Sequence, residues 1–431
     1  MPSITSQYLA RYRRLGAGEG ADDPLPVTGA QRRFVLVRSL DPVGRPDLVP
    51  MFFAFPRGTV DPARLTAAAD RLAALHPVLR ARPTVVRGTP VLLPQQPAVP
   101  LARVHPAPGE DTTSTLRRAL ADWTPQGPPI RMFLAQDEAD DGEEVLAIVL
   151  DHAACDGQSL ARLVDELEAA YTEGPAATGP GPGEAVAELA SYREAVLLQL
   201  EAEDRASSPA AMAYWGERLR ATREQAPQPR ANRPIAAELP SGSAELMLPS
   251  AAPGVPFPDL LDACRAAART LYGAGHVVPI GYPWGGRPPG AAPVLGCFLN
   301  TVVFPAATAQ TSDAHPTSSA WWDDLDRADT PFDAVVHAAR AAGSGWTGRL
   351  DGLLTVDDAT RRPLLRLGGV TAREIHIDGR SVRGPFAVSV TQGTELHLRM
   401  VWDRAVLDDD TAERAFTALT DAVREPAGTP G

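Results

Sequence analysis

The segment between residues 130 and 171 constrains the fold most, because it places two buried strands, a polar turn and a helix in direct succession. The apolar runs Ile130–Gln136 and 145–150 are bounded by Gly, Pro or acidic residues, which is typical of buried strands. From Leu160 onward, apolar residues return at helical spacing. Residues 151–159 therefore form a turn from strand to helix.

The same alternation continues along the chain and predicts a mixed α/β fold. A helix is predicted after Asp61, an N-cap residue followed by Pro62 at the first helical position. Further apolar patterns predict helices at 189–200, 211–219 and 259–271, and strands at 277–282, 299–304, 386–390 and 396–402. No short internal repeat is visible, although related halves need not share visible sequence similarity.

A Gly- and Pro-rich stretch, GPAATGPGPG at 174–183, has no periodicity and is typical of a linker or exposed loop. We therefore predict an N-terminal subdomain at 1–175, a linker at 176–186 and a C-terminal subdomain at 187–431. The chain contains no lysine, so all 41 basic residues are arginines. This excludes P-loop, pyridoxal and Ser-Lys hydrolase chemistry, each of which requires a lysine.

The net charge of −12 argues against a general nucleic-acid binder, which needs a basic surface. The N-terminus lacks the apolar stretch of a signal peptide, and no later run approaches membrane-spanning length. We expect a cytoplasmic protein without membrane association. Cys155, Cys264 and Cys297 lie far apart without metal-ligand spacing, so neither a metal site nor a disulfide is predicted.

The turn DHAACDG at 151–157 carries the candidate chemistry. His152 leaves a buried strand, and its near-neutral pKa suits proton transfer from a rigid scaffold. Gly157 would let backbone pass close to the site, and Asp156 could hold local geometry through a charged partner. Cys155 is interpreted as a packing residue rather than a thiol nucleophile.

This turn resembles the HHxxxDG motif of nonribosomal peptide synthetase condensation domains and their chloramphenicol-acetyltransferase-like relatives. Six further segments are similar to other motifs of that family and follow in the expected order, which extends the resemblance over almost the whole chain. They are TGAQRRF at 28–34, HPVLR at 76–80, YWGERL at 214–219, IGYPWGGRP at 280–288, GCFLNT at 296–301 and DTPFD at 329–333. Within HPVLR, the apolar neighbours of His76 indicate helix-end packing.

The resemblance implies two chloramphenicol-acetyltransferase-like subdomains in a V-shaped pseudo-dimer, with His152 in a central tunnel. A donor would arrive as a thioester on the phosphopantetheine arm of a separate carrier protein, and His152 would deprotonate or orient an amine or hydroxyl nucleophile. No cofactor would be bound and no covalent acyl-enzyme would form. Asp156 would form a structural salt bridge with Arg287, backbone near Gly157 could stabilise the oxyanion, and Asn300 and Trp284 are substrate-binding candidates.

Asp151 is the clearest departure, because the family usually has the first histidine of the pair at this position. We expect Asp151 to support the site, although consecutive strand residues point to opposite faces, so the pattern does not place its side chain against His152. A late family motif is not recognisable around residues 351–360.

The leading interpretation is a free-standing, monomeric condensation enzyme that forms an amide or ester in natural-product or antibiotic biosynthesis. One alternative is an acyl-coenzyme A-dependent O- or N-acyltransferase acting on a small molecule. Another is a non-catalytic docking module of the condensation-like type, and an epimerase relative is a further possibility. The sequence leaves the donor and the nucleophile open.

Overall fold

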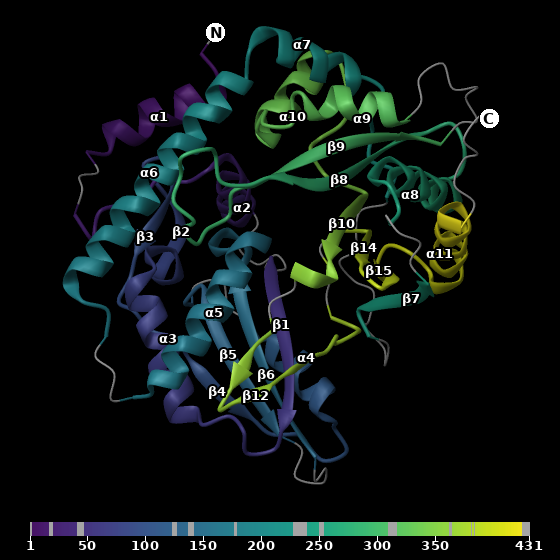
Figure 1. The fold of residues 1–431 in the computed structure, drawn as a ribbon. Helices are drawn as coiled ribbons and strands as arrows, with labels where there is room; N and C mark the ends of the chain where they lie inside the picture. The colour runs from purple at the N-terminus through teal and green to yellow at the C-terminus, as the bar shows by residue number, and fades with distance from the viewer. Residues whose placement is uncertain are drawn as a thin grey trace. The chain divides into compact units, whose positions relative to one another are not determined.

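The chain forms two compact units, each built from several separate segments. The structure is a computed structural model that describes residues 2–16, 20–40, 47–122, 127–136, 142–175, 179–226, 239–249, 254–308, 317–361, 364–380, 382 and 384–424 (Figure 1). Unit 1 comprises Met1–Ala202, Gly286–Leu299 and Pro363–Ile377, and unit 2 comprises Glu203–Gly285, Asn300–Arg362 and Asp378–Gly431. The chain therefore passes between the units after residues 202, 285, 299, 362 and 377.

This division differs from the boundaries predicted at 175 and 187. Helix α6 (Pro182–Ala206) begins inside the predicted linker, because proline is tolerated in the first helical turn. Two segments of the predicted C-terminal subdomain, 286–299 and 363–377, belong to unit 1. Residues 176–178 of the predicted linker lie outside the described residues.

Unit 1 is built around a five-stranded sheet with the order β13-β1-β6-β5-β4. Its strands are β1 (Leu48–Pro56), β4 (Leu101–Val104), β5 (Ile130–Gln136), β6 (Glu143–Asp151) and β13 (Arg373–Glu374). All neighbours are antiparallel except β4 and β5. Its other elements are α1 (Ile4–Arg14), α2 (Gly29–Leu40), α3 (Pro62–Leu75), η1 (Pro77–Arg80), β2 (Ala81–Val86), β3 (Thr89–Pro94), α4 (Thr112–Ala121), η2 (His152–Ala154), α5 (Gly157–Glu173), β11 (Arg366–Leu367), β12 (Val370–Thr371) and most of α6.

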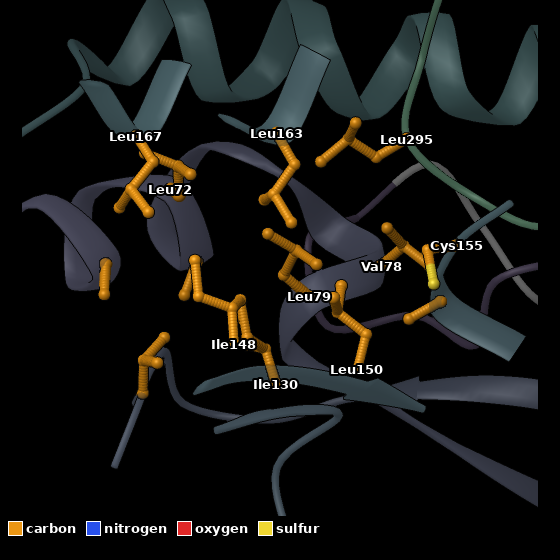
Figure 2. Packing of buried hydrophobic residues seen from close by; sticks show 14 of the residues in the cluster. Leu72, Val78, Leu79, Ile130, Ile148, Leu150, Cys155, Leu163, Leu167 and Leu295 are labelled. Carbon is orange, nitrogen blue, oxygen red and sulfur yellow. The ribbon is translucent and has the colours of Figure 1, made fainter. Parts of the chain in front are cut away.

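Strand β6 is apolar over residues 145–150, where both of its faces are buried. Leu146, Ile148 and Leu150 enter the core shared with α3 and α5, whereas Ala147 and Val149 enter a second cluster with α4. This alternation is the period of two that a strand imposes on its side chains. Figure 2 shows the first core, in which leucines of α3 and α5 face isoleucines of β5 and β6. The strand that carries His152 therefore ends in a rigid scaffold.

A charged cluster joins three helices of unit 1, namely α3, α5 and α6. His76, at the C-terminal cap of α3, is fully buried, and its Nδ1 lies 2.9 Å from Glu188 of α6. Its Nε2 is hydrogen-bonded to Glu166 of α5. Arg162 bonds both carboxylates, at 2.6 Å and 3.0 Å, and donates to the Pro293 carbonyl at 2.6 Å. His76 is therefore part of an ion network and not the simple packing residue that its apolar neighbours indicated.

Unit 2 is built around a six-stranded sheet with the order β7-β15-β14-β10-β8-β9. The strands are β7 (Ser241–Pro249), β8 (Val277–Gly285), β9 (Leu299–Ala307), β10 (Gly352–Asp358), β14 (Phe386–Gln392) and β15 (Glu395–Asp403). Its helices are α7 (Pro209–Arg218), α8 (Phe257–Tyr272), α9 (Thr317–Leu325), α10 (Phe332–Ala341), η3 (Ala359–Arg361) and α11 (Asp409–Arg424). The fully buried side chains of its core include Trp215, Trp346 and Trp402.

The two sheets share a connection pattern that relates the units. In unit 1, β1 is antiparallel to β6, β6 to β5, and β5 is parallel to β4. In unit 2, β7 is antiparallel to β15, β15 to β14, and β14 is parallel to β10. Helix α5 follows β6 as α11 follows β15. The predicted mixed α/β architecture is confirmed, and none of the described helices is both long and apolar enough to cross a membrane.

Candidate active site

His152 follows the last residue of β6 and opens the short helix η2. Its backbone N–H donates to the Asp47 carbonyl at 3.0 Å, and the N–H of Asp151 donates to the Pro129 carbonyl at 2.7 Å. Backbone contacts to two neighbouring strand ends therefore fix the main chain at the histidine. The half-buried side chain of His152 projects from this fixed point.

Helix α2 holds the side chains of the Asp151–His152 pair from one face. The Phe34 ring stacks on the imidazole, with ring centroids 4.6 Å apart and planes inclined by 24°. One turn later, Arg38 forms an ion pair with Oδ2 of Asp151. Residues four apart share a helix face, so the two contacts reinforce each other. Oδ1 of Asp151 accepts the N–H of Ala153 at 3.0 Å, which caps η2.

The segment TGAQRRF connects α2 to the site. Thr28 and Gln31 form reciprocal hydrogen bonds at the start of α2, from the Thr28 N–H to Gln31 Oε1 at 3.0 Å and from the Gln31 N–H to Thr28 Oγ1 at 3.2 Å. Gln31 Nε2 donates to the Ala153 carbonyl at 2.8 Å, and the Thr28 hydroxyl donates to the Cys297 carbonyl at 2.7 Å. The segment thus positions the site through its side chains.

The surroundings of His152 favour its neutral form. Burial lowers the pKa of the imidazole, and the nearby charge of Arg33 lowers it further, whereas its own carbonyl, Asp151 and Asp156 act in the opposite direction. Within the described residues, Nδ1 is buried and makes no hydrogen bond to another group. An imidazole that is neutral at pH 7 can accept a proton, which is the requirement for a general base.

Asp156 and Arg287 form the ion pair that the family resemblance implies. Arg287 donates to both carboxylate oxygens, at 2.7 and 2.8 Å, and the Asp156 side chain is fully buried. Asp156 also accepts the N–H groups of Ser159 and Phe298, both at 2.9 Å. It therefore caps α5 and joins that helix to the 286–299 segment.

Gly157 and Cys155 are explained differently by the structure. Gly157 is exposed at the first position of α5, and a Cβ atom there would contact nothing within 4 Å. Internal packing therefore does not require glycine, and a role near an oxyanion remains a proposal. Cys155 is buried against the core beside Val78, and burial raises the pKa of its thiol well above the usual range (Figure 2). A protonated, buried thiol suits packing rather than nucleophilic attack.

Asn300 and Trp284 belong to unit 2, whereas His152 belongs to unit 1. The Asn300 amide donates to the Ala328 and Thr330 carbonyls, both at 2.7 Å, and accepts the Phe332 N–H at 3.1 Å. Its side chain is thus committed to the loop before α10, which is a structural role. Trp284 is exposed near the end of β8 and retains its proposed role as a substrate-binding candidate.

Unit 2 contains a turn that corresponds to the site by position and by hydrogen bonding. The sequence DRAVLDD at 403–409 follows β15 as DHAACDG follows β6. The Asp403 N–H donates to the Pro385 carbonyl at 3.0 Å, and its carboxylate accepts the Ala405 N–H at 2.9 Å. Asp151 makes the same two types of contact. Both aspartates therefore cap a turn at the end of a strand.

The chemistry of the two turns differs at the functional positions. Arg404 stands where unit 1 has His152, and Asp409 stands where it has Gly157. Arg404 Nε and Asp409 Oδ1 lie 3.0 Å apart in an ion pair. In unit 2 these two positions are thus joined by an ion pair, whereas in unit 1 they hold an imidazole and a glycine, which cannot form one.

Comparisons with known proteins identify sequences and solved structures that are similar to this chain. No family model matches the chain. The probable non-canonical nonribosomal peptide synthetase CymA of Salinispora arenicola is 28% identical over 328 residues, and the AMB antimetabolite synthetase AmbE of Pseudomonas aeruginosa is 31% identical over 317 residues. These matches cover 66% and 68% of this chain but only 4% and 14% of the two synthetases.

Solved structures show the same fold. The X-domain from teicoplanin biosynthesis has a TM-score of 0.67 at 20% identity, with 94% of this chain and 96% of that chain covered. The first condensation domain of the CDA synthetase has a TM-score of 0.67 at 17% identity, with 95% and 98% covered. The X-domain in complex with OxyB has a TM-score of 0.63 at 19% identity, with 94% of each chain covered.

Proposed function

We propose, on the premise that this chain is a condensation-domain-like protein, that it transfers an acyl or aminoacyl group from a carrier-protein thioester to an amine or hydroxyl. The observation that carries the proposal is His152, a fixed, half-buried imidazole with a lowered pKa at the end of a buried strand. Its position agrees with the histidine of the family motif. The acyl group would be carried on phosphopantetheine, as the resemblance implies.

In the proposed reaction, His152 accepts the proton of the nucleophile as its nitrogen or oxygen attacks the thioester carbonyl. The new carbon–nitrogen or carbon–oxygen bond forms, the carbon–sulfur bond breaks, and the phosphopantetheine thiol leaves with the proton. No cofactor or oxidant is consumed. Backbone N–H groups near Gly157, at the N-terminus of α5, are the proposed partners of the developing oxyanion.

The experiment is a competition between the same acyl group on a carrier protein and on coenzyme A, with each product quantified by mass spectrometry. We expect a much higher kcat/KM for the carrier-bound donor, because docking of the carrier contributes binding energy away from the reacting carbon. His152→Ala should lower turnover by ~10²-fold or more while the protein remains folded. His105→Ala, a change at an exposed histidine, is the control and should keep full turnover.

Two outcomes would redirect the assignment. Equal or better use of the coenzyme A thioester would favour a small-molecule O- or N-acyltransferase. Full turnover in folded His152→Ala would remove the general-base role and favour proton transfer assisted by the substrate itself.

A docking module is the second candidate function. It is supported by the similarity to the X-domain, one structure of which is a complex with OxyB. If the chain is a docking module, we expect stable binding to a partner enzyme, measured by calorimetry. We then expect no product with any donor. Binding that His152→Ala leaves unchanged, together with absent turnover in the native protein, would favour it over acyl transfer.

A further inference from the structure

We propose that Arg38 is a positioning residue that cancels the charge of Asp151 and thereby keeps His152 neutral and able to accept a proton. The inference rests on the proposed function for its catalytic meaning. The pairing itself is a property of the free protein and can be measured without any substrate.

The first step concerns why a carboxylate stands beside the histidine. Asp151 caps η2 through the Ala153 N–H, and Asp403 caps the corresponding turn of unit 2 through the Ala405 N–H. Unit 2 has no histidine at this turn, so the aspartate serves the turn and not the imidazole. The structural requirement for the cap therefore places a negative charge next to His152.

The second step is the effect of that charge. A nearby carboxylate favours the protonated imidazole, and Asp151 and Asp156 both act in this direction on His152. Asp156 is already paired with Arg287. From α2, Arg33 acts in the opposite direction. The carboxylate of Asp151 is almost fully buried, so water screens it poorly.

The third step is the placement of Arg38. Its side chain is only 17% exposed, and its guanidinium pairs with the Asp151 oxygen that does not cap η2. Phe34, one turn earlier on the same helix, stacks on His152. The helix that orients the imidazole therefore also carries the countercharge for its neighbour. In unit 2, Arg404 stands at the position that corresponds to His152. That turn therefore contains no imidazole that must be kept neutral.

The test is a proton NMR titration of the His152 ring in the full chain, with its signal assigned by its loss in His152→Ala. In Arg38→Gln, the charge of Asp151 is no longer cancelled, and the pKa of His152 should rise by roughly half a pH unit or more. Arg38→Lys keeps the positive charge and should leave the pKa near the native value. In the active enzyme, the acidic limb of the kcat/KM profile should move to higher pH with Arg38→Gln.

A double variant keeps the inference testable even where Arg38→Gln alone does not fold. Asp151→Asn retains the cap but leaves the positive charge of Arg38 without a counter-ion, so the pKa of His152 should fall. Adding Arg38→Gln removes that positive charge and should return the pKa of His152 toward the native value. Equal pKa values in Asp151→Asn and the double variant would overturn the inference, as would an unchanged or lowered pKa in folded Arg38→Gln. If these pKa shifts are observed but the native protein shows no turnover, only the proposed function is contradicted.

Discussion

Both carboxylate oxygens of Asp156 accept hydrogen bonds within the site. It accepts from Ser159 and Phe298 backbone groups, from the Ser159 hydroxyl and from Arg287. Arg287 in turn donates to the Val294 and Gly296 carbonyls. A buried pair of this kind is strongly destabilised when one partner is removed, because the other charge is left without compensation.

We therefore expect Asp156→Ala to lower the free energy of unfolding by about 3 kcal/mol or more, because it strands Arg287 and removes the α5 cap. Asp156→Asn retains a cap oxygen and should cost less. The measurement is urea unfolding followed by circular dichroism. Arg373→Ala is the control, since the Arg373–Glu143 pair is 63% and 50% exposed and should contribute at most about 1 kcal/mol. A native melting temperature with lost turnover in Asp156→Ala would assign Asp156 a direct chemical role.

At the scale of elements, the network around His76 joins α3, α5 and α6 of unit 1 through charges. Burial by itself would lower the pKa of His76, but hydrogen bonds and the charges of Glu166 and Glu188 raise it above its usual value. The raised value means that His76 favours its protonated form in the folded state. Its contribution to stability is therefore fully present below the unfolded pKa, near 6.5, and is lost as pH rises through the folded pKa.

We expect His76→Gln to lower the free energy of unfolding by about 2 kcal/mol at pH 6 and by less at pH 8.5, because the native network weakens when the imidazolium loses its proton. Unfolding curves in urea at both pH values give the comparison. His105→Gln, at an exposed histidine, should show no such difference. A cost for His76→Gln that is the same at both pH values would show that packing, and not charge, accounts for its effect.

The elements themselves were predictable because hydrophobic period is a local signal. The strand at Ile130–Gln136 matches β5, and the predicted cap at Asp61 accepts the Ala63 N–H at 2.8 Å. His152 could be selected as a candidate because strand, turn and helix adjoin it in the sequence. Asn300 shows the limit, since a motif position does not reveal that its amide is already bonded to three backbone groups.

Contacts between distant residues were not predictable from the same signals. The Arg38–Asp151 pair joins residues 113 positions apart, and the Gln31–Ala153 bond spans 122. No local sequence pattern around Arg38 or Gln31 indicates which distant residue its side chain contacts. The ion network at His76 was missed for the same reason. The apolar neighbours of His76 correctly indicated the end of α3, but they could not indicate its contacts with Glu166 and Glu188.

At the scale of the whole molecule, each unit depends on segments from distant parts of the chain. A fragment of residues 1–202 lacks the 286–299 and 363–377 segments of unit 1. It would lose Leu295, Phe298 and Leu367 from the main core and the partner of Asp156. We expect this fragment to show no cooperative thermal transition by circular dichroism, because its core is incomplete.

A chain ending at residue 377 is the matched comparison, since it contains all three segments of unit 1 and should show a transition. A cooperative transition in the 1–202 fragment would show that the later segments are dispensable for the core. It would also favour the simpler division into consecutive subdomains that the linker-like sequence predicted.

The interleaving of the two units has a consequence for synthesis on the ribosome. Unit 1 cannot acquire its last segment until translation has advanced from Ala202 to Ile377. At about 5–20 residues per second, that interval lasts roughly 10 to 35 seconds. During this time the nascent first unit exposes apolar surface that Leu295, Phe298 and Leu367 later cover. Chaperones that bind nascent apolar segments therefore have many seconds in which to engage this chain before its first core closes.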